Sequence, residues 1–108
     1  LPPCDHDLMA TLHLLSPTPF GDSRFTSCLP LLADSDALLL TGDATYALSA
    51  GTQPAAELER LPEQVAVFAL DEDVQARALS ALPARVQLLD YAGFVELTCR
   101  YQRVNSWL

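Results

Sequence analysis

The chain has 108 residues, enough for one domain with an ordinary core and too few for an additional catalytic domain. Half of its residues are hydrophobic, but no apolar run approaches the ~20 residues that a membrane span requires, so we expect no membrane partner. Fourteen acidic and six basic residues give a formal net charge of −8, the opposite of the balance that grips a phosphate backbone, so we expect no direct contact with nucleic acid.

The first eight residues form a polar, proline-bearing lead-in without periodicity, and we expect the folded domain to span residues 9–108. Met9 directly before the first apolar run resembles a translation start, so residues 1–8 are expected to be a disordered segment, an extension or the product of a misplaced gene boundary. Cys4 and His6 lie within it. Two ligands do not make the four-ligand site of a structural zinc, so we expect no metal there.

The first strand is expected over residues 11–15, where Ser16-Pro17 begins a turn that excludes further pairing. Asp22 or Ser23 is suited to cap a first helix that carries an apolar stripe. Pro30 interrupts that stripe. It kinks the helix if the helix begins near Asp22, and it lies in the first turn at little cost if the helix begins at Ser27.

Strands and helices then alternate along the chain. A strand is expected over residues 37–41, a short helix over 44–50 ended by Gly51 as a left-handed cap, and a helix over 54–61. A strand over 65–70 and a helix over 74–82 follow, with Pro83 as the stop.

The last third of the chain contains a strand, a turn and a helix start within a few residues. Residues 86–89 form a short apolar run that predicts a central strand buried on both faces. Asp90 is placed to cap the next helix through the N–H of Ala92 or Gly93. Phe94, Leu97, Thr98 and Tyr101 share one face of it at helical spacing. Residues 103–107 predict a terminal edge strand.

This alternation predicts the α/β class, as a single three-layer α/β/α domain with a mostly parallel sheet of about five strands. Acidic residues follow the expected strands at the positions where helices begin: Asp43, Asp71 to Asp73, and Asp90. The simple interpretation is that these carboxylates are N-caps. Because they occupy the helix N–H groups that an anion would need, this edge of the sheet is a poor phosphate or nucleotide site.

Motifs for other chemistry are missing from the sequence. There is no glycine-rich nucleotide fingerprint, no P-loop and no nucleophile elbow, so we expect no cofactor. His13 lies between Leu12 and Leu14, where a hydrogen-bonded structural role is favoured over a role as base or metal ligand. We expect no metal site in the domain.

The cysteines are an odd number without framework spacing, and no signal-peptide pattern precedes them, which predicts reduced thiols in the cytoplasm. Cys28 follows Arg24 by one helical turn and lies beside Pro30, so it is the best candidate for a reactive thiol. The alternative is that Cys28 is a small buried hydrophobe. Cys99 has no Cys-x-x-Cys partner and is expected to be structural.

Several short stretches together resemble the TusB/DsrH family of small sulfur-relay subunits. The segment 89–98 and the tryptophan nine residues after it match the family's C-terminal signature. Further matches are Leu12-His13, Ser16-Pro17, Ser27-Cys28-Leu29, Gly42-Asp43 before Tyr46-Ala47-Leu48, and Ala76-Arg77-Ala78-Leu79. The resemblance extends from Met9 to Trp107, and it implies the DsrEFH-like fold.

The resemblance also implies a function. Family members act as accessory subunits of a cytoplasmic relay that supplies persulfide sulfur for 2-thiolation of the tRNA wobble uridine, or, for DsrH-type members, in dissimilatory sulfur oxidation. They pair with TusC/DsrF-like and TusD/DsrE-like subunits in a heterohexamer, in which the TusD/DsrE-like subunit carries the principal persulfide. Some members have a cysteine at the position of Cys28, which makes this residue a possible secondary sulfur acceptor and catalytic candidate.

Partner contacts are the last expectation. Tyr91 at the first helical position and Trp107 at the terminal strand are the interface candidates, because aromatic residues near a surface often become buried against a partner. An alternative hypothesis is that the chain is a regulatory or structural module that self-associates and carries no sulfur.

Overall fold

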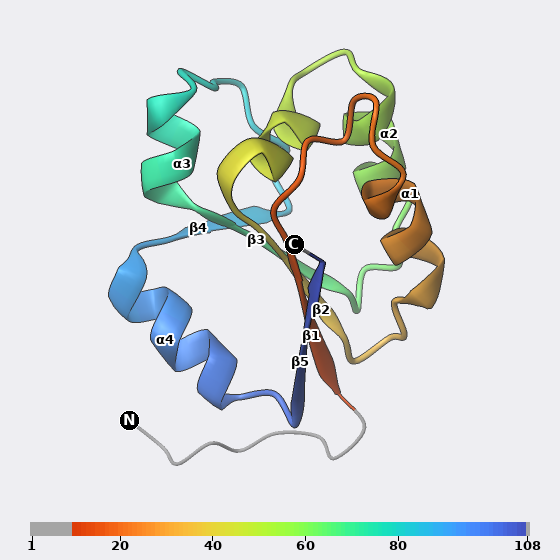
Figure 1. Cartoon of the computed structure of the whole chain (residues 1–108), viewed down its shortest axis with the longest axis vertical. Helices are drawn as coiled ribbons and strands as arrows, with labels where there is room; N and C mark the ends of the chain where they lie inside the picture. The colour runs from red at the N-terminus through yellow and green to blue at the C-terminus, as the bar shows by residue number, and fades with distance from the viewer. Residues whose placement is uncertain (1–9, 108) are drawn as a thin grey trace.

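Five parallel strands form one sheet in the order β4-β3-β2-β1-β5 (Figure 1), in a computed structural model that describes residues 10–107. The parallel pairing confirms the predicted α/β class. The strands are β1 (Thr11–Leu15), β2 (Ala37–Leu40), β3 (Ala66–Leu70), β4 (Val86–Leu89) and β5 (Arg103–Trp107). The expectations that residues 11–15 and 86–89 are strands and that 103–107 is a terminal edge strand are confirmed.

Helical segments connect the strands. They are α1 (Arg24–Cys28), the 3₁₀ turn η1 (Leu29–Leu31), the 3₁₀ helix η2 (Gly42–Leu48), α2 (Gln53–Glu59), α3 (Asp71–Ala76) and α4 (Tyr91–Cys99). Between residues 10 and 107, none of these is long and apolar enough to cross a membrane.

The order of the strands explains where the helices lie. From β1 to β4 each step moves one place in the same direction, so right-handed crossovers put α1, η2, α2 and α3 on one face. The connection from β4 to β5 returns across the whole sheet, and its helix α4 covers the opposite face (Figure 1). The predicted three layers are therefore uneven, because α4 is the one helix on its face among residues 10–107.

Two hydrophobic clusters correspond to these two faces. The larger one joins Leu15, Leu38, Leu40 and Val67 of the sheet to side chains of the four segments on the first face, including Phe25 and Cys28. The smaller one joins Leu12, Leu39 and Phe68 to Leu97 of α4. Since Leu12 and Leu15 belong to different clusters, the alternation along β1 directs His13 to the first face, with Leu15.

The prediction that residues 86–89 form the central strand is wrong. β4 lies at one edge of the sheet, and Leu88 is 41% exposed. Ala37–Leu40, which is buried at every position, occupies the centre instead. A four-residue apolar run predicts a strand, but it does not encode the strand's place in the order.

The region around Pro30 has a feature of each of the two predicted arrangements, namely an early helix start and a proline in a first turn. The helix begins after Ser23, as in the first of them, but it ends at Cys28 and continues as η1, in whose first turn Pro30 lies. The chain ends the helix rather than kinking it, because proline has no N–H to continue the α-helical pattern.

Three helices differ from the predicted bounds, of which α2 (Gln53–Glu59, expected over 54–61) differs least. The helix expected over residues 74–82 is α3, which starts and ends earlier, and Ala78 and Ala81 beyond it have left-handed backbone angles, each with φ of +53°. The helix expected over 44–50 is the 3₁₀ helix η2. Gly51 is left-handed as predicted, with φ of +80°.

Candidate functional site

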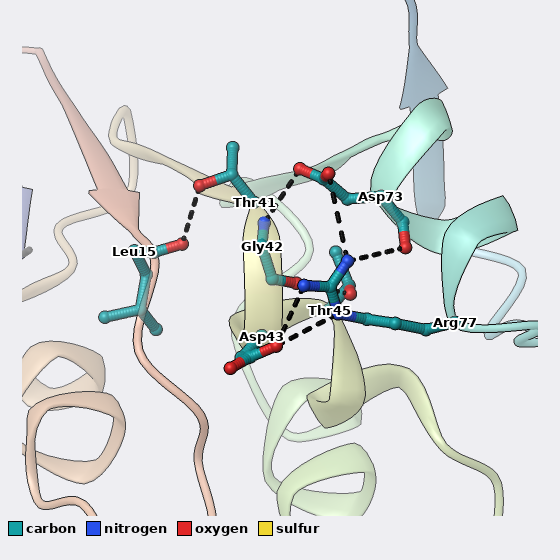
Figure 2. A network of polar contacts seen from close by, with 7 residues as sticks. All are labelled: Leu15, Thr41, Gly42, Asp43, Thr45, Asp73 and Arg77. Atoms are coloured by element: carbon teal, nitrogen blue, oxygen red, sulfur yellow. Dashed lines mark hydrogen bonds and ion pairs between the residues drawn. The ribbon is translucent and has the colours of Figure 1, made fainter.

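The carboxyl edge of the sheet, where α/β proteins usually bind ligands, is occupied by the protein's own side chains (Figure 2). Asp73 of α3 accepts a hydrogen bond from the N–H of Gly42, with 2.8 Å between Oδ2 and nitrogen. Gly42 has φ of +52°, and a Cβ on it would lie 3.3 Å from Oγ of Ser16. A side chain at this position would therefore be both strained and crowded.

Arg77 closes the same edge. Its guanidinium donates to Oδ1 of Asp43 at 2.8 Å and 3.2 Å and to the carbonyl of Asp73 at 3.2 Å (Figure 2). It also lies over the ring of Tyr46, with 5.7 Å between Cζ and the ring centroid. The arginine connects η2 to α3 and neutralises part of the acidic charge at this edge.

The N-cap interpretation is correct for one acidic residue and wrong for others. Asp90 caps α4 by accepting from the N–H of Gly93 at 2.8 Å, as predicted. The N-cap of η2 is Thr41 and that of α3 is Leu70, and neither makes a side-chain cap bond.

Asp43 and Asp71 instead lie in the first turn of their helices, where the negative charge of a carboxylate interacts favourably with the helix dipole. Asp73 caps a neighbouring segment, since its bond goes to Gly42 of η2. Carboxylates of the protein thus surround the N–H groups that an anion would use, and this arrangement disfavours phosphate.

Cys28, the sulfur-acceptor candidate, is fully buried in the larger cluster beside Phe25. Burial, with a smaller contribution from the negative charge of Asp36, raises the pKa of its thiol from 9.0 to about 12. Arg24 lies one helical turn before Cys28, but its Nε is 3.5 Å from Oδ1 of Asp22, so its charge pairs with that carboxylate. At neutral pH the thiol is protonated, so in this conformation it is a poor nucleophile.

Of the other two cysteines, Cys99 lies within the described residues and Cys4 does not. Cys99 is disulfide-bonded, so the expectation of reduced thiols is wrong for this residue. Cys4, His6 and the expected extension lie outside the described residues. Within residues 10–107, no group of three or more histidine, cysteine or acidic side chains is placed to hold a metal ion.

His13 is 4% exposed and hydrogen-bonded, as the structural interpretation requires. Its Nδ1 accepts from Nε1–H of Trp107 at 3.2 Å, and its Nε2 lies 3.5 Å from Oδ2 of Asp36. Trp107, one interface candidate, is therefore half-buried against the larger cluster.

Tyr91, the other interface candidate, is 58% exposed at the start of α4. It makes an edge-to-face contact with Phe94, at 6.3 Å between ring centroids. Val95, one turn after Tyr91, is 62% exposed. The outer side of α4 thus presents two large apolar side chains to solvent, one helical turn apart.

Sequence reasoning missed three residues that organise this structure: Asp36, Arg77 as an ion-pair partner, and Arg85. Asp36 directly precedes a buried strand, and its carboxylate accepts from the N–H groups of Thr11 and Ala33. A buried acid before an apolar strand is a usable signal. The arginines give no such signal, because Asp43 is 34 residues from Arg77 and the carbonyls that Arg85 binds are 20 or more residues away from it.

The chain is similar to known proteins over most of its length. The family model described as DsrH like protein matches residues 17–104. Protein TusB of Escherichia coli K12 is 34% identical over 97 residues, which cover 89% of this chain and 99% of the relative. Protein TusB of Salmonella enteritidis PT4 is 36% identical over 84 residues, covering 77% and 86%. The crystal structure of the ychN protein from E. coli superposes with a TM-score of 0.76 at 20% identity, covering 92% of this chain and 100% of that one.

Proposed function

Since this chain belongs to the DsrH-like family, we propose that it is an accessory subunit of a sulfur-relay complex that supplies persulfide sulfur for 2-thiolation of the tRNA wobble uridine. The observation that carries the proposal is the similarity to TusB proteins along nearly the whole chain. The closed carboxyl edge and the protonated, buried thiol support an accessory role rather than a catalytic one.

The partners in this proposal are TusC/DsrF-like and TusD/DsrE-like subunits, joined with this chain in a heterohexamer in the cytoplasm. The TusD/DsrE-like subunit carries the sulfur on its own cysteine. This chain contributes a docking surface, for which the exposed side chains Tyr91 and Val95 of α4 are the strongest candidates. Trp107 is the second candidate, through the part of its side chain that remains exposed.

The hypothesis that Cys28 is a secondary sulfur acceptor stays a prediction. Sulfur transfer requires a thiolate that attacks the outer sulfur of a persulfide and is accessible to a donor. Cys28 has no accessible surface in this structure, so the transfer would require α1 to move away from the sheet. We propose that the residue acts primarily as part of the core.

Co-expression with the two partner subunits tests the accessory role. We expect the three chains to purify together as one particle, measured by size-exclusion chromatography with light scattering. Replacing Tyr91 and Val95 together by serine should weaken the particle, because both side chains are exposed and apolar. Phe20→Ser is the matched control, since Phe20 is 49% exposed on the loop after β1. A chain that stays outside the particle contradicts the proposal.

A second function is favoured by one observation. The cysteine in Ser27-Cys28-Leu29 is typical of some DsrH-type members, which belong to dissimilatory sulfur oxidation. The two pathways differ in their product. Deleting the gene for this chain lowers wobble-uridine 2-thiolation in the first case and leaves it unchanged in the second, as measured by mass spectrometry of digested tRNA.

A further inference from the structure

Two buried polar side chains, His13 and Asp36, meet the half-buried indole of Trp107 beside β1, and the proposed accessory role uses neither the imidazole nor the carboxylate. His13 and Asp36 are 4% and 5% exposed. Trp107 belongs to β5, the edge strand that pairs only with β1 within the described residues. The contacts run from the indole of Trp107 to Nδ1 of His13 at 3.2 Å, and from Nε2 of His13 to Oδ2 of Asp36 at 3.5 Å.

The hydrogen bond from the indole indicates which tautomer of the neutral imidazole fits this arrangement. An indole N–H is a donor only, so Nδ1 of His13 must present a lone pair to it. The neutral ring then carries its proton on Nε2, which faces Asp36. Nδ1 therefore accepts the indole hydrogen bond, and Nε2 lies 3.5 Å from the carboxylate of Asp36.

Asp36 is held in place independently of the histidine. Its Oδ1 accepts from the N–H of Thr11 at 2.9 Å, and its Oδ2 accepts from the N–H of Ala33 at 3.0 Å. A carboxylate anchored in this way remains beside the imidazole in both of the ring's charge states. It can balance the positive charge of an imidazolium without moving.

We propose that His13 is a proton-operated latch on the C-terminal strand β5. The neutral ring accepts the indole hydrogen bond and fastens Trp107 to the core. When the ring takes up a proton from solvent, the proton binds at Nδ1, which turns that nitrogen into a donor facing another donor. The indole bond is then lost, the imidazolium stays with Asp36, and β5 keeps only its backbone pairing with β1 and the apolar packing of Trp107.

Solvent reaches this group through an open groove of about 600 Å³ that His13 and Asp36 line together with Arg103 and Asn105 of β5. Within residues 10–107, the titratable groups in its surroundings come from several elements. The carboxylate of Asp36, which precedes β2, lies 3.5 Å from Nε2 of His13, and Arg103 of β5 lines the same groove. The charge of Asp36 also acts on the thiol of Cys28 in α1 and on the hydroxyl of Tyr101, which packs on the other face.

The protein's single tryptophan makes the latch directly observable, because one indole N–H resonance reports on Trp107 alone. The experiment follows that resonance and the His13 ring nitrogens by ¹⁵N NMR of the full chain from about pH 8 to about pH 5. We expect the Nε2–H tautomer at the upper end. As His13 titrates, the indole signal should shift with the same midpoint, and its hydrogen exchange should quicken about tenfold, the factor for losing one typical net hydrogen bond.

Two variants identify the responsible residue. His13→Gln keeps an oxygen acceptor that does not titrate, so at each pH it supplies the reference exchange rate and should show no transition. His6→Gln removes the chain's other histidine and should leave the midpoint unchanged. The latch is refuted if His13 titrates without altering the indole signal, if His13 stays neutral until the fold is lost, or if His13→Gln shows the same transition.

Discussion

The burial of Cys28 leads to a quantitative expectation for its reactivity. A thiol with the usual pKa of 9.0 is about one-tenth ionised at pH 8, whereas one whose pKa is raised to about 12 is ionised to only ~10⁻⁴. Ionisation alone therefore slows alkylation about a thousandfold. The absence of accessible surface at Cys28 slows it further, because the reagent must wait for the structure to open.

Timed alkylation by iodoacetamide at pH 8 measures this rate. The reaction is quenched at intervals, and the peptide that contains Cys28 is quantified by mass spectrometry, for the native chain and for the chain in urea. We expect the native rate to be at least about a thousandfold lower than the rate in urea. The ratio should not change when a persulfide donor replaces iodoacetamide.

A neighbouring position provides the control. Ser27 is exposed beside Cys28, so the double variant Ser27→Cys with Cys28→Ala places a thiol on the same turn at the surface. That thiol should react at nearly the same rate with and without urea. If the alkylation rate of native Cys28 is within tenfold of the rate of this control thiol, Cys28 is accessible in solution. That result would favour the sulfur-acceptor hypothesis over a purely structural role for Cys28.

Three further predictions concern stability. Arg85 donates to the carbonyls of Leu58, Leu61, Pro62 and Val65 at 2.7–2.9 Å, so Arg85→Met should lower the free energy of unfolding by about 3 kcal/mol. Equal effects of Arg85→Met and Arg60→Met in urea denaturation would show that these four hydrogen bonds do not stabilise the fold. Asp90→Ala should lower the free energy of unfolding by about 1 kcal/mol, and Asp90→Asn should lower it much less, because asparagine also caps a helix. Thermal melts in which Asp90→Asn is at least as destabilising as Asp90→Ala would contradict the capping role of Asp90. Because the folded state keeps the Cys28 proton up to a pKa of about 12 and the unfolded state loses it near 9, the free energy of unfolding should fall by up to about 1.4 kcal/mol per pH unit between these values. Cys28→Ala should lack that slope in urea denaturation at alkaline pH, and an identical slope would contradict it.

The sequence predicted the strands well because the signal for a short strand is local. Thr11–Leu15 and Arg103–Trp107 have the predicted bounds, and both are flanked by turn-forming or polar residues. The order of the strands was not predictable in the same way. The run Val86–Leu89 is at the edge because α4 carries the chain back across the sheet, and no feature of the run itself records that.

The site was only partly predictable for a related reason. The cap formed by Asp90 spans three residues, so the sequence shows both partners together. The contacts of Asp43 with Arg77 and of Asp73 with Gly42 span more than 30 residues and depend on how η2 and α3 pack. Burial of Cys28 was one of two open alternatives, because an apolar stripe does not reveal how completely the sheet covers a small side chain.

We propose above all that this chain supports sulfur transfer by docking and does not itself carry the sulfur. Intact-mass spectrometry of the reconstituted complex of this chain with its two proposed partners, after loading with a persulfide donor, tests that claim directly. We predict that the mass of one sulfur atom appears on the TusD/DsrE-like subunit, while the mass of this chain stays unchanged. A sulfur adduct on this chain that disappears in Cys28→Ala would contradict the account.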